Sequence, residues 1–209
     1  MAHHHGHGGA CSHEHDHEES DELGVQYSLY QKIDLEKVAC LNELVEGSGK
    51  TVFKPWDQRL IKDQYVQSDA DEELLFNIPF TGQIKLKAVL LVGGEGNSHP
   101  AKMRLFKNRP TMSFDDTTIE PEQEFELTRD ESGTVEYPLR VAKFANLTHL
   151  SIHFPTNFGD ESTKIYYIGL RGEFQGELRD QVVLAVYEAR AIPQDHKGEI
   201  PEGARQNIF

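Results

Sequence analysis

Four acidic side chains fall within five positions of the stretch YVQSDADEELLFNIPFTG, residues 65–82, just before the chain becomes apolar. Carboxylates at this density could form a cage for a hard metal ion, act as an acid–base pair, or form a charged, solvated segment beside a buried strand. Which of these is present largely decides what the protein does. The four residues are Asp69, Asp71, Glu72 and Glu73.

The acidic stretch does not have the spacing of a calcium loop. An EF-hand loop that began at Asp69 would need glycine at its sixth position and glutamate at its twelfth, and Leu74 and Phe80 stand there instead. Nothing nearby in the sequence would perturb the carboxylates as acid–base catalysis requires. In an extended chain Glu72 also points away from its acidic neighbours. The pattern therefore favours a solvated entry to a strand over a catalytic or metal site.

The first 22 residues, MAHHHGHGGACSHEHDHEESDE, form a second group with ligand chemistry. Imidazole and thiolate groups suit zinc, copper or nickel, and after removal of Met1 a free amine on Ala2 would add a further ligand for copper or nickel. A segment with almost no apolar residues offers no fixed geometry. We therefore expect a solvating tail with adventitious metal binding at most, and no dedicated cofactor. The candidate ligands are His3, His4, Cys11, His13, His15 and His17.

The other motifs give no support for an enzyme. EGSGKT at residues 46–51 ends like a phosphate-binding P-loop, but Leu44 stands where that motif needs its first glycine. GGEGN at residues 93–97 lacks the setting of a dinucleotide site, and no G-x-S-x-G elbow is present. His149 and His153 would lie about 13 Å apart on one strand face. They are expected to be polar-face residues of a half-exposed strand, and no catalytic residue is predicted.

The charge balance excludes several classes of partner. The chain has 35 acidic against 21 basic residues, a formal charge of −14, and no basic stripe. Nucleic acid and anionic membrane surfaces both repel such a protein. Apolar runs such as AVLLV at residues 88–92 are far shorter than the roughly 20 residues of a membrane-spanning helix. Two cysteines without a CxxC motif, and a start unlike a signal peptide, favour the cytoplasm and nucleus.

Alternation with a period of two dominates the chain between its ends and predicts strands. LTHLSIHF places Leu150, Ile152 and Phe154 on one face, while KIYYIGLRGEF and QVVLAVYEA are apolar on both faces, as in the core of a sandwich. Turn clusters such as GGEGNSHP and TNFGDEST separate these runs. One short helix is predicted, with Asp34 as the cap of LEKVACLNEL. Several short strands between turns predict an all-β fold, a β-sandwich or jelly roll.

These patterns divide the chain into three parts. Residues 1–22 form the His- and acid-rich tail, residues 23–190 one β-sandwich domain, and residues 191–209 a second tail in which proline, glycine and charge alternate. Both tails are expected to be flexible, because they cannot bury enough apolar surface to offset the cost of ordering. A monomer is expected.

Six stretches of the sequence resemble the PITH domain, the proteasome-interacting thioredoxin domain. SDADEELLFNIPFTGQIKLKAVLL, which contains the acidic stretch, is similar to the signature segment of that family. VACLNE, VFKPW, MRLFKN, MSFDD and YYIGLRGE agree with the family in the expected order, and the matches span about residues 23–190. The histidine-rich start and the single domain resemble the members of the family that stand alone.

The resemblance implies a β-sandwich of jelly-roll type and an interaction module that associates with the 26S proteasome. In the thioredoxin-linked relative, redox chemistry belongs to a separate domain with a CxxC motif, which this chain lacks. The expected function is a non-enzymatic adaptor or regulator whose partner is the proteasome regulatory particle. The strand entry and the C-terminal tail provide the candidate contacts. They are Asp69, Asp71, Glu72, Glu73, His196, Ile208 and Phe209.

A different class of function is a sandwich that binds a carbohydrate or another small molecule, since fold alone does not settle function. A lectin-like site would need an aromatic platform and polar side chains that converge at one cluster of loops. Trp56, Asn97, His99 and Asp160 are available for it. The sequence alone does not bring them together.

Overall fold

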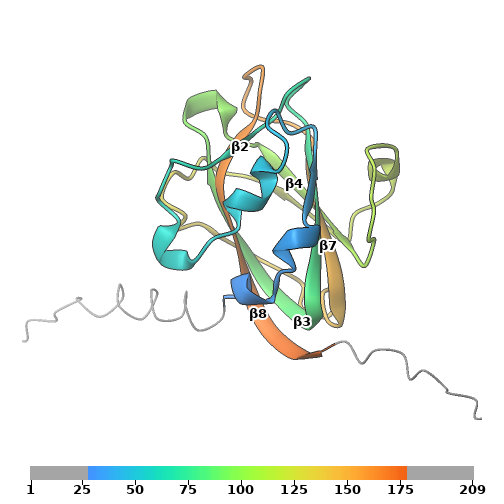
Figure 1. The fold of residues 1–209 in the computed structure, drawn as a ribbon. Helices are drawn as coiled ribbons and strands as arrows, with labels where there is room; N and C mark the ends of the chain where they lie inside the picture. Colours follow the sequence, from blue (N-terminus) through green and yellow to red (C-terminus); the bar gives the residue numbers. More distant parts are fainter. Residues whose placement is uncertain (1–27, 178–209) are drawn as a thin grey trace, which may run out of the picture. The chain divides into compact units, whose positions relative to one another are not determined.

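The computed structural model describes residues 28–177, which fold into antiparallel strands joined by loops with short 3-10 turns (Figure 1). The predicted tails and the predicted strand QVVLAVYEA lie outside the described residues. The strands are β1 (Ala39–Leu41), β2 (Val66–Gln67), β3 (Leu74–Gly93), β4 (Lys102–Lys107), β5 (Gln123–Glu126), β6 (Glu136–Pro138), β7 (Leu147–Phe154) and β8 (Lys164–Glu177). The 3-10 turns are η1 (Tyr30–Lys32), η2 (Leu35–Lys37), η3 (Ser48–Val52), η4 (Trp56–Gln58), η5 (Gly96–Ser98) and η6 (Asp115–Thr118).

The long strand β3 belongs to both layers of a β-sandwich. Its first part, Leu74–Pro79, pairs with β1 on one side and with β7 on the other. Its second part, Gly82–Gly93, pairs with β8 and, over Ala88–Leu90, with β6. The first layer continues from β7 to β4 and β5, and the second from β8 to β2. The predicted all-β sandwich is confirmed, whereas the jelly-roll connection stays a prediction.

Strand β3 passes from one layer to the other near Gly82. Its register against β7 shifts between Pro79 and Ile84, as it does at bulges where a strand changes direction. A side chain at Gly82 would overlap the carbonyl oxygen of Gly176 and the ring of Phe174. Glycine is therefore required where β3 and β8 lie this close to each other.

The main core lies between the two layers. Phe76 of β3 packs edge-to-face against Phe53 and Phe154, with ring centroids 6.0 Å apart in both pairs. Leu150 and Ile152 of β7 are fully buried beside them. The inward face predicted for LTHLSIHF is therefore confirmed.

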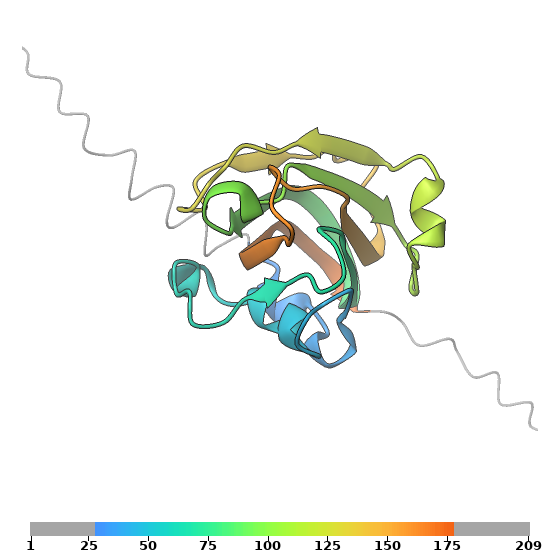
Figure 2. The same ribbon diagram turned by 90° about the horizontal axis from the view of Figure 1, so that it is seen from above.

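Loops cover the outer faces of both layers. Met112 packs on Leu75 and Phe106 over the first layer, and Trp56 packs on Tyr167 over the second. Figure 2 shows the blue and cyan segments that precede β2 together on one side of the strands. This covering explains why β3 and β8 are apolar on both faces.

The predicted helix after Asp34 is wrong. Residues 35–37 form a single 3-10 turn, and β1 begins at Ala39. The Asp34 side chain forms no cap hydrogen bond and instead accepts one from Lys37 at 2.8 Å. Pairing of Ala39 with Asn77 of β3 overrides the local helix propensity. Across residues 28–177 we find no helix with the length and hydropathy to cross a membrane.

Candidate functional site

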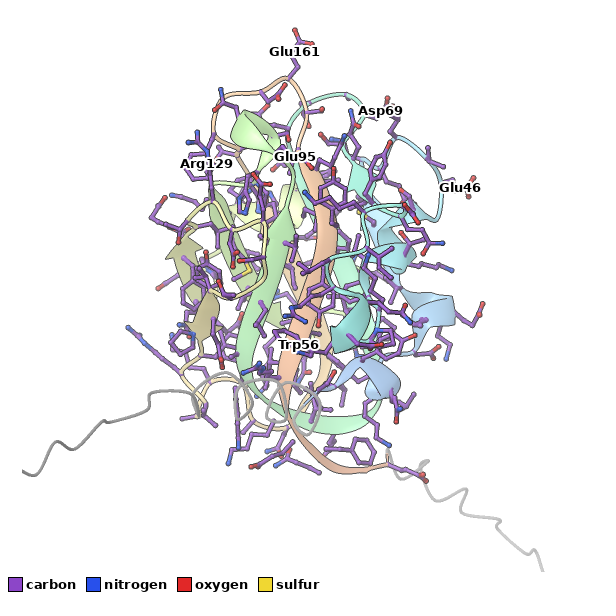
Figure 3. The ribbon with its side chains drawn as sticks, turned by 90° about the vertical axis from the view of Figure 1, so that its left-hand side faces the viewer. Glu46, Trp56, Asp69, Glu95, Arg129 and Glu161 are labelled. Atoms are coloured by element: carbon purple, nitrogen blue, oxygen red, sulfur yellow. The ribbon has the colours of Figure 1, made fainter. Side chains whose placement is uncertain are left out.

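The acidic stretch is held by Asn42, which adopts a left-handed conformation with φ 66°. The Asn42 amide donates to Asp71 Oδ1 and to the carbonyl of Glu73, both at 2.7 Å, and its own oxygen accepts from the N–H of Ala70 at 3.0 Å. Asp71 Oδ1 also accepts from the N–H of Glu73 at 3.0 Å. Asp71 therefore has a structural role in the loop, whereas Asp69 is exposed at one end of the molecule (Figure 3). Glu72 accepts from the Thr163 hydroxyl through its carbonyl at 2.6 Å.

Glu73 differs from the other three acids because it reaches a buried histidine. Its Oε1 lies 2.5 Å from Nε2 of His153 on β7. His153 is only 2% exposed, and its Nδ1 has no hydrogen-bond partner. Burial lowers the pKa of His153, the hydrogen bond to Glu73 opposes this shift, and the positive charge of Arg104 adds to it. A neutral imidazole that donates through Nε2 fits this environment.

Ser151 and His153 on one face of β7 are buried, so the prediction of a half-exposed polar face is wrong for His153, whereas it is confirmed for His149, which is half-buried. Ser151 donates to Asn77 Oδ1 at 2.8 Å, and the Asn77 amide donates to the Met112 carbonyl at 2.9 Å. Arg104 holds the covering loop, residues 108–122, through the carbonyl of Thr117 at 2.6 Å. The covering loop could have been anticipated from the apolar residues within MSFDD. The segment otherwise resembles a turn.

A metal centre is absent from the part of the chain that the structure describes, where no group of three or more potential ligands comes together. His149 and His153 both lie on β7, and His153 is engaged by Glu73. The candidate ligands His3, His4, Cys11, His13, His15 and His17 all precede residue 28, outside the described range. The candidate contacts His196, Ile208 and Phe209 lie outside it at the other end.

The EGSGKT loop forms an anion-binding turn, but its anion is a side chain of this protein. Glu43 Oε1 accepts from the N–H of Gly47 and Glu43 Oε2 from the N–H of Gly49, both at 2.6 Å. The Ser48 hydroxyl donates to the same carboxylate at 3.3 Å. A phosphate would have to displace Glu43, which gives a physical reason for rejecting the P-loop. The bonds also fix the turn that follows β1.

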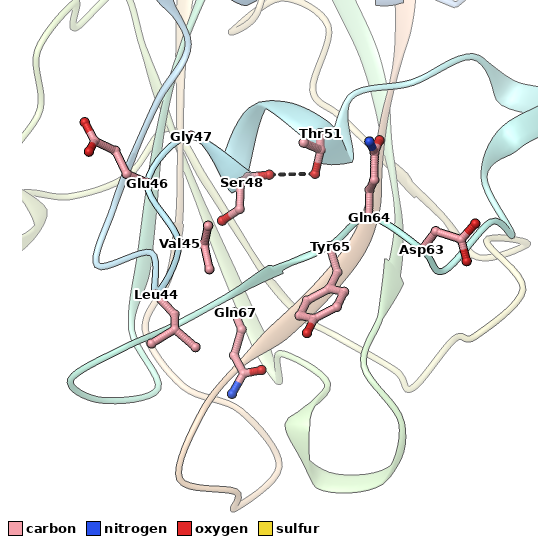
Figure 4. Close-up of a pocket in the computed structure, with 10 residues that line it drawn as sticks. All are labelled: Leu44, Val45, Glu46, Gly47, Ser48, Thr51, Asp63, Gln64, Tyr65 and Gln67. Atoms are coloured by element: carbon pink, nitrogen blue, oxygen red, sulfur yellow. Dashed lines mark hydrogen bonds between the residues drawn. The ribbon is translucent and has the colours of Figure 1, made fainter.

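A pocket of about 380 Å³ opens beside this loop (Figure 4). The backbone N–H of Leu44 donates to the carbonyl of Gln67 at 2.8 Å and thereby brings the segment after β1 alongside β2. Apolar side chains of Leu44, Val45 and Tyr65 line the middle of the pocket, and polar or charged residues surround them. These are Glu46, Gly47, Ser48, Thr51, Asp63, Gln64 and Gln67.

The same segment carries every exposed large hydrophobic residue of the described chain. All five fall within residues 44–65, although the described chain is 150 residues long. Scattered exposed apolar residues need no explanation, but Leu44, Val45 and Tyr65 line one pocket together, and apolar residues gathered in this way are typical of an interaction surface. Sequence reasoning missed this site, because LVEG and RLIKDQY contain too few apolar residues to stand out before the fold is known. The five are Leu44 (53% exposed), Val45 (64%), Leu60 (51%), Ile61 (48%) and Tyr65 (41%).

Tyr65 is tied to a network of aromatic and charged side chains. Its ring packs edge-to-face on Tyr166 at 5.8 Å between centroids, and Lys164 lies 4.6 Å from its centroid. The Tyr166 hydroxyl donates to Glu95 at 2.8 Å, as does the ammonium group of Lys62. The bond from Lys62, then that from Tyr166, lowers the pKa of Glu95 to about 2. These contacts hold Tyr65 in place as a lining residue of the pocket.

The residues considered for a carbohydrate site do not all converge. Asn97 accepts from Arg129 at 2.8 Å and so lies at the end of the sandwich where Figure 3 shows Arg129 and Glu161. Trp56 lies well away from that end in the same view, 4.0 Å from the Arg59 guanidinium and packed on Tyr167.

His99 and the ring of Phe158, in the same part of the structure, are already engaged by other groups. Nδ1 of the buried His99 bonds to the Pro100 carbonyl at 2.7 Å, and its Nε2 accepts from the N–H of Asp130 at 3.1 Å. The guanidinium of Arg129 lies 4.4 Å from the centroid of the Phe158 ring and covers that face of it. This end of the sandwich therefore offers neither a free histidine nor an uncovered aromatic platform on that face.

Comparison with solved structures gives a β-sandwich. The chain is similar to the CBM32-1 and CBM32-2 domains of Clostridium perfringens ZmpB in complex with GalNAc, with a TM-score of 0.55 and 10% identity. The match covers 74% of this chain and 38% of that larger chain. The same domains in a second structure give a TM-score of 0.53. At this identity the similarity concerns the fold alone.

Comparison of sequences gives much closer relatives. PITH domain-containing protein 1 of Danio rerio is 59% identical over 181 residues, which cover 87% of this chain and 86% of the relative. The Homo sapiens protein of the same name is 52% identical over 200 residues, 94% of each chain. A PITH domain model matches residues 19–191. The chain therefore belongs to the PITH domain family.

Proposed function

We propose that this protein is a non-enzymatic interaction module that docks on the regulatory particle of the 26S proteasome in the cytoplasm and nucleus, as an adaptor or regulator. The observation that carries the proposal is the concentration of exposed apolar side chains in residues 44–65. Such a surface suits protein partners better than small solutes. The proteasome is named as partner because of the family to which the chain belongs.

The proposal that the protein is not an enzyme is supported by the bonds and the burial of its reactive side chains. Glu73 and His153 bond to each other beneath the covering loop. Both ring nitrogens of His99 are engaged. Burial raises the pKa of the Cys40 thiol, so the nucleophilic thiolate is disfavoured. Glu73, His153 and His99 are thus engaged by groups of this protein, and Cys40 is held as the thiol.

The tails extend the proposed contact. Ile208 and Phe209 would act as apolar anchors, and His196 would reach an open coordination position of a partner metal. Asp69 and Glu72 would face basic groups of the partner. The N-terminal histidines would bind zinc, copper or nickel only adventitiously. The protein alone would be a monomer.

The decisive experiment is co-sedimentation of the full chain with purified 26S proteasome. Val45→Glu places a charge in the apolar surface at a residue that is 64% exposed, so the fold should tolerate it. Thr156→Glu adds the same charge at an exposed position elsewhere and serves as the matched control. We expect the Thr156 variant to bind like the wild type and the Val45 variant to lose binding. Failure of the wild-type chain to co-sediment would remove the proposal.

A carbohydrate-binding function has less support. The structurally similar CBM32 domains share only the fold with this chain, and Trp56 does not join Asn97 at the end of the sandwich (Figure 3). A glycan array probed with the full chain tests the alternative. Saturable binding lost in Asn97→Ala, with binding to the proteasome absent, would favour it over the module proposed here.

A further inference from the structure

The pocket beside the Glu43-bound turn has a composition that restricts what can enter it. We propose that it binds a segment of a partner protein in which one large apolar residue is flanked by lysine or arginine. This inference rests on the proposed function, since it gives the chemistry of the partner at the same surface. It is carried by the apolar centre of the pocket, the charge of its rim and the rigidity of its walls.

The centre of the pocket is suited to one apolar side chain. Leu44, Val45 and Tyr65 line it and are between 41% and 64% exposed, so their contact area with water is large. Its volume of about 380 Å³ is in the lower part of the range of about 300–1,000 Å³ typical of ligand sites. Covering these side chains removes apolar surface from water, which is the main driving force of association.

The rim of the pocket is acidic. Glu46 and Asp63 are charged lining residues on opposite sides in Figure 4, and none of the ten lining residues is basic. Neither carboxylate forms an ion pair with another residue in the 28–177 range. Lys164 lies against the Tyr65 ring and Lys54 feels the charge of Asp63, but neither lines the pocket. Basic groups on both sides of the apolar anchor would complement this rim.

The walls of the pocket are fixed before a partner arrives. Glu43 bonds to two N–H groups of the turn at Gly47 and Gly49, and the Thr51 hydroxyl donates to the Ser48 carbonyl at 2.7 Å. On the other side Tyr65 is held against Tyr166. A preorganised pocket loses little entropy on binding, which favours recognition of a short segment.

The charge of the rim also excludes other occupants. A phosphate or nucleic acid would meet two carboxylates and the overall charge of −14. The chain's own C-terminal sequence GARQNIF has one arginine near two apolar residues, and it is a competing occupant that the experiment below separates from a partner.

The test is selection of random dodecapeptides displayed on phage against the immobilised full chain, with parallel selections on variants. The wild type should enrich one large apolar residue with lysine or arginine within two positions on either side. The Val45→Glu variant should bind the enriched peptide at least about tenfold more weakly, the loss expected for one buried anchor. Thr156→Glu should bind it like the wild type.

A second variant isolates the charge. Glu46→Gln combined with Asp63→Asn keeps the shape of the rim but removes its charge, so it should retain the apolar preference and lose the basic flanks. Melting curves confirm that each variant is folded. Enrichment of peptides without basic flanks, equal binding to the Val45 variant, or no consensus would overturn the proposal. A consensus that appears only after deletion of residues 192–209 would identify the chain's own tail as the occupant and would also overturn it.

The two proposals can fail separately. If the full chain selects basic–apolar peptides but does not co-sediment with the proteasome, the pocket chemistry stands and the named partner is wrong. If the chain co-sediments but the Val45 variant does so equally well and no consensus appears, the proteasome is contacted elsewhere and the pocket proposal is wrong.

Discussion

Glu73, the last residue of the acidic stretch, lies 2.5 Å from the buried imidazole of His153 on β7. The contact joins the loop that leads into β3 to the strand paired with β3, since Leu75 stands opposite His153. Of the four acidic residues in this stretch, Glu73 is therefore the one whose carboxylate bonds to a buried histidine. Its partner is a histidine that the sequence pattern placed on a solvated face.

Stability should decrease when the pH falls below about 6.5, the ordinary pKa of histidine. Burial lowers the pKa values of His153, His99 and His149 in the folded state, so between their unfolded and folded pKa values only the unfolded chain takes up the protons. The contribution of these neutral histidines to the free energy of unfolding is therefore complete above pH 6.5 and is lost towards lower pH. Each such proton costs about 1.4 kcal/mol per pH unit.

Urea unfolding at a series of pH values between 7.5 and 5 measures this effect. The lowered carboxyl pKa values, such as that of Asp130, act only at more acidic pH. His153→Gln should flatten the profile in part and leave the contributions of His99 and His149. A profile that is flat in the wild type over this range would contradict the buried, neutral state of His153 and His99.

Replacing Glu73 by Gln should destabilise the protein by about 1–3 kcal/mol, because a buried histidine loses its charged acceptor. Glu72→Gln is the matched control, since in the structure Glu72 contributes its carbonyl rather than its carboxylate, and its effect should be within about 0.5 kcal/mol. The midpoints of urea unfolding at pH 7.5 give both values. Equal effects of the two changes would mean that the Glu73 to His153 bond adds nothing.

Replacing Glu43 by Ala should loosen the turn beside the pocket. Two N–H groups lose their acceptor, so the amide hydrogens of Gly47 and Gly49 should exchange faster with solvent, and the loss of stability should be about 1–3 kcal/mol. Hydrogen exchange read by NMR measures this directly. Glu46→Gln changes an adjacent carboxylate without touching those bonds, and unchanged exchange is expected there.

Replacing Gly82 by Ala should destabilise the protein by at least about 2 kcal/mol, because the added methyl group would overlap the Gly176 carbonyl and force β3 and β8 apart. Thr81→Ala tests the adjacent position, where the exposed side chain makes only a long bond of 3.3 Å to the Lys32 carbonyl. A thermal melt distinguishes the two. If Gly82→Ala melts like the control, the close approach of the two strands is overstated.

The inward faces of the strands could be predicted because alternation reports burial directly. Leu150, Ile152 and Phe154 are buried as expected. The helix after Asp34 was predicted wrongly because pairing with β3, a contact distant in sequence, decides the conformation there. The exposure of His153 on the outer face of β7 was predicted wrongly for a similar reason, since the loop that covers it follows a different strand.

The candidate site was beyond sequence reasoning for a further reason. Leu44 and Tyr65 are 21 positions apart in the chain, and contacts distant in sequence, such as the bond from Leu44 to Gln67, bring their segments together. The acidic stretch attracted attention by its density, yet Asp71 and Glu73 have structural partners. A high density of like residues draws attention to one segment of the sequence. A pocket depends instead on which segments folding brings together.

The passage of β3 through both layers has a consequence for how the molecule comes apart. Loss of either layer disturbs the other, because each contains part of the same twenty-residue strand. Partly unfolded states that expose a single layer should be rare. A protease or unfoldase should therefore act on this region only after it has unfolded as a whole. If the protein docks on the proteasome as proposed, such all-or-none resistance would protect it there.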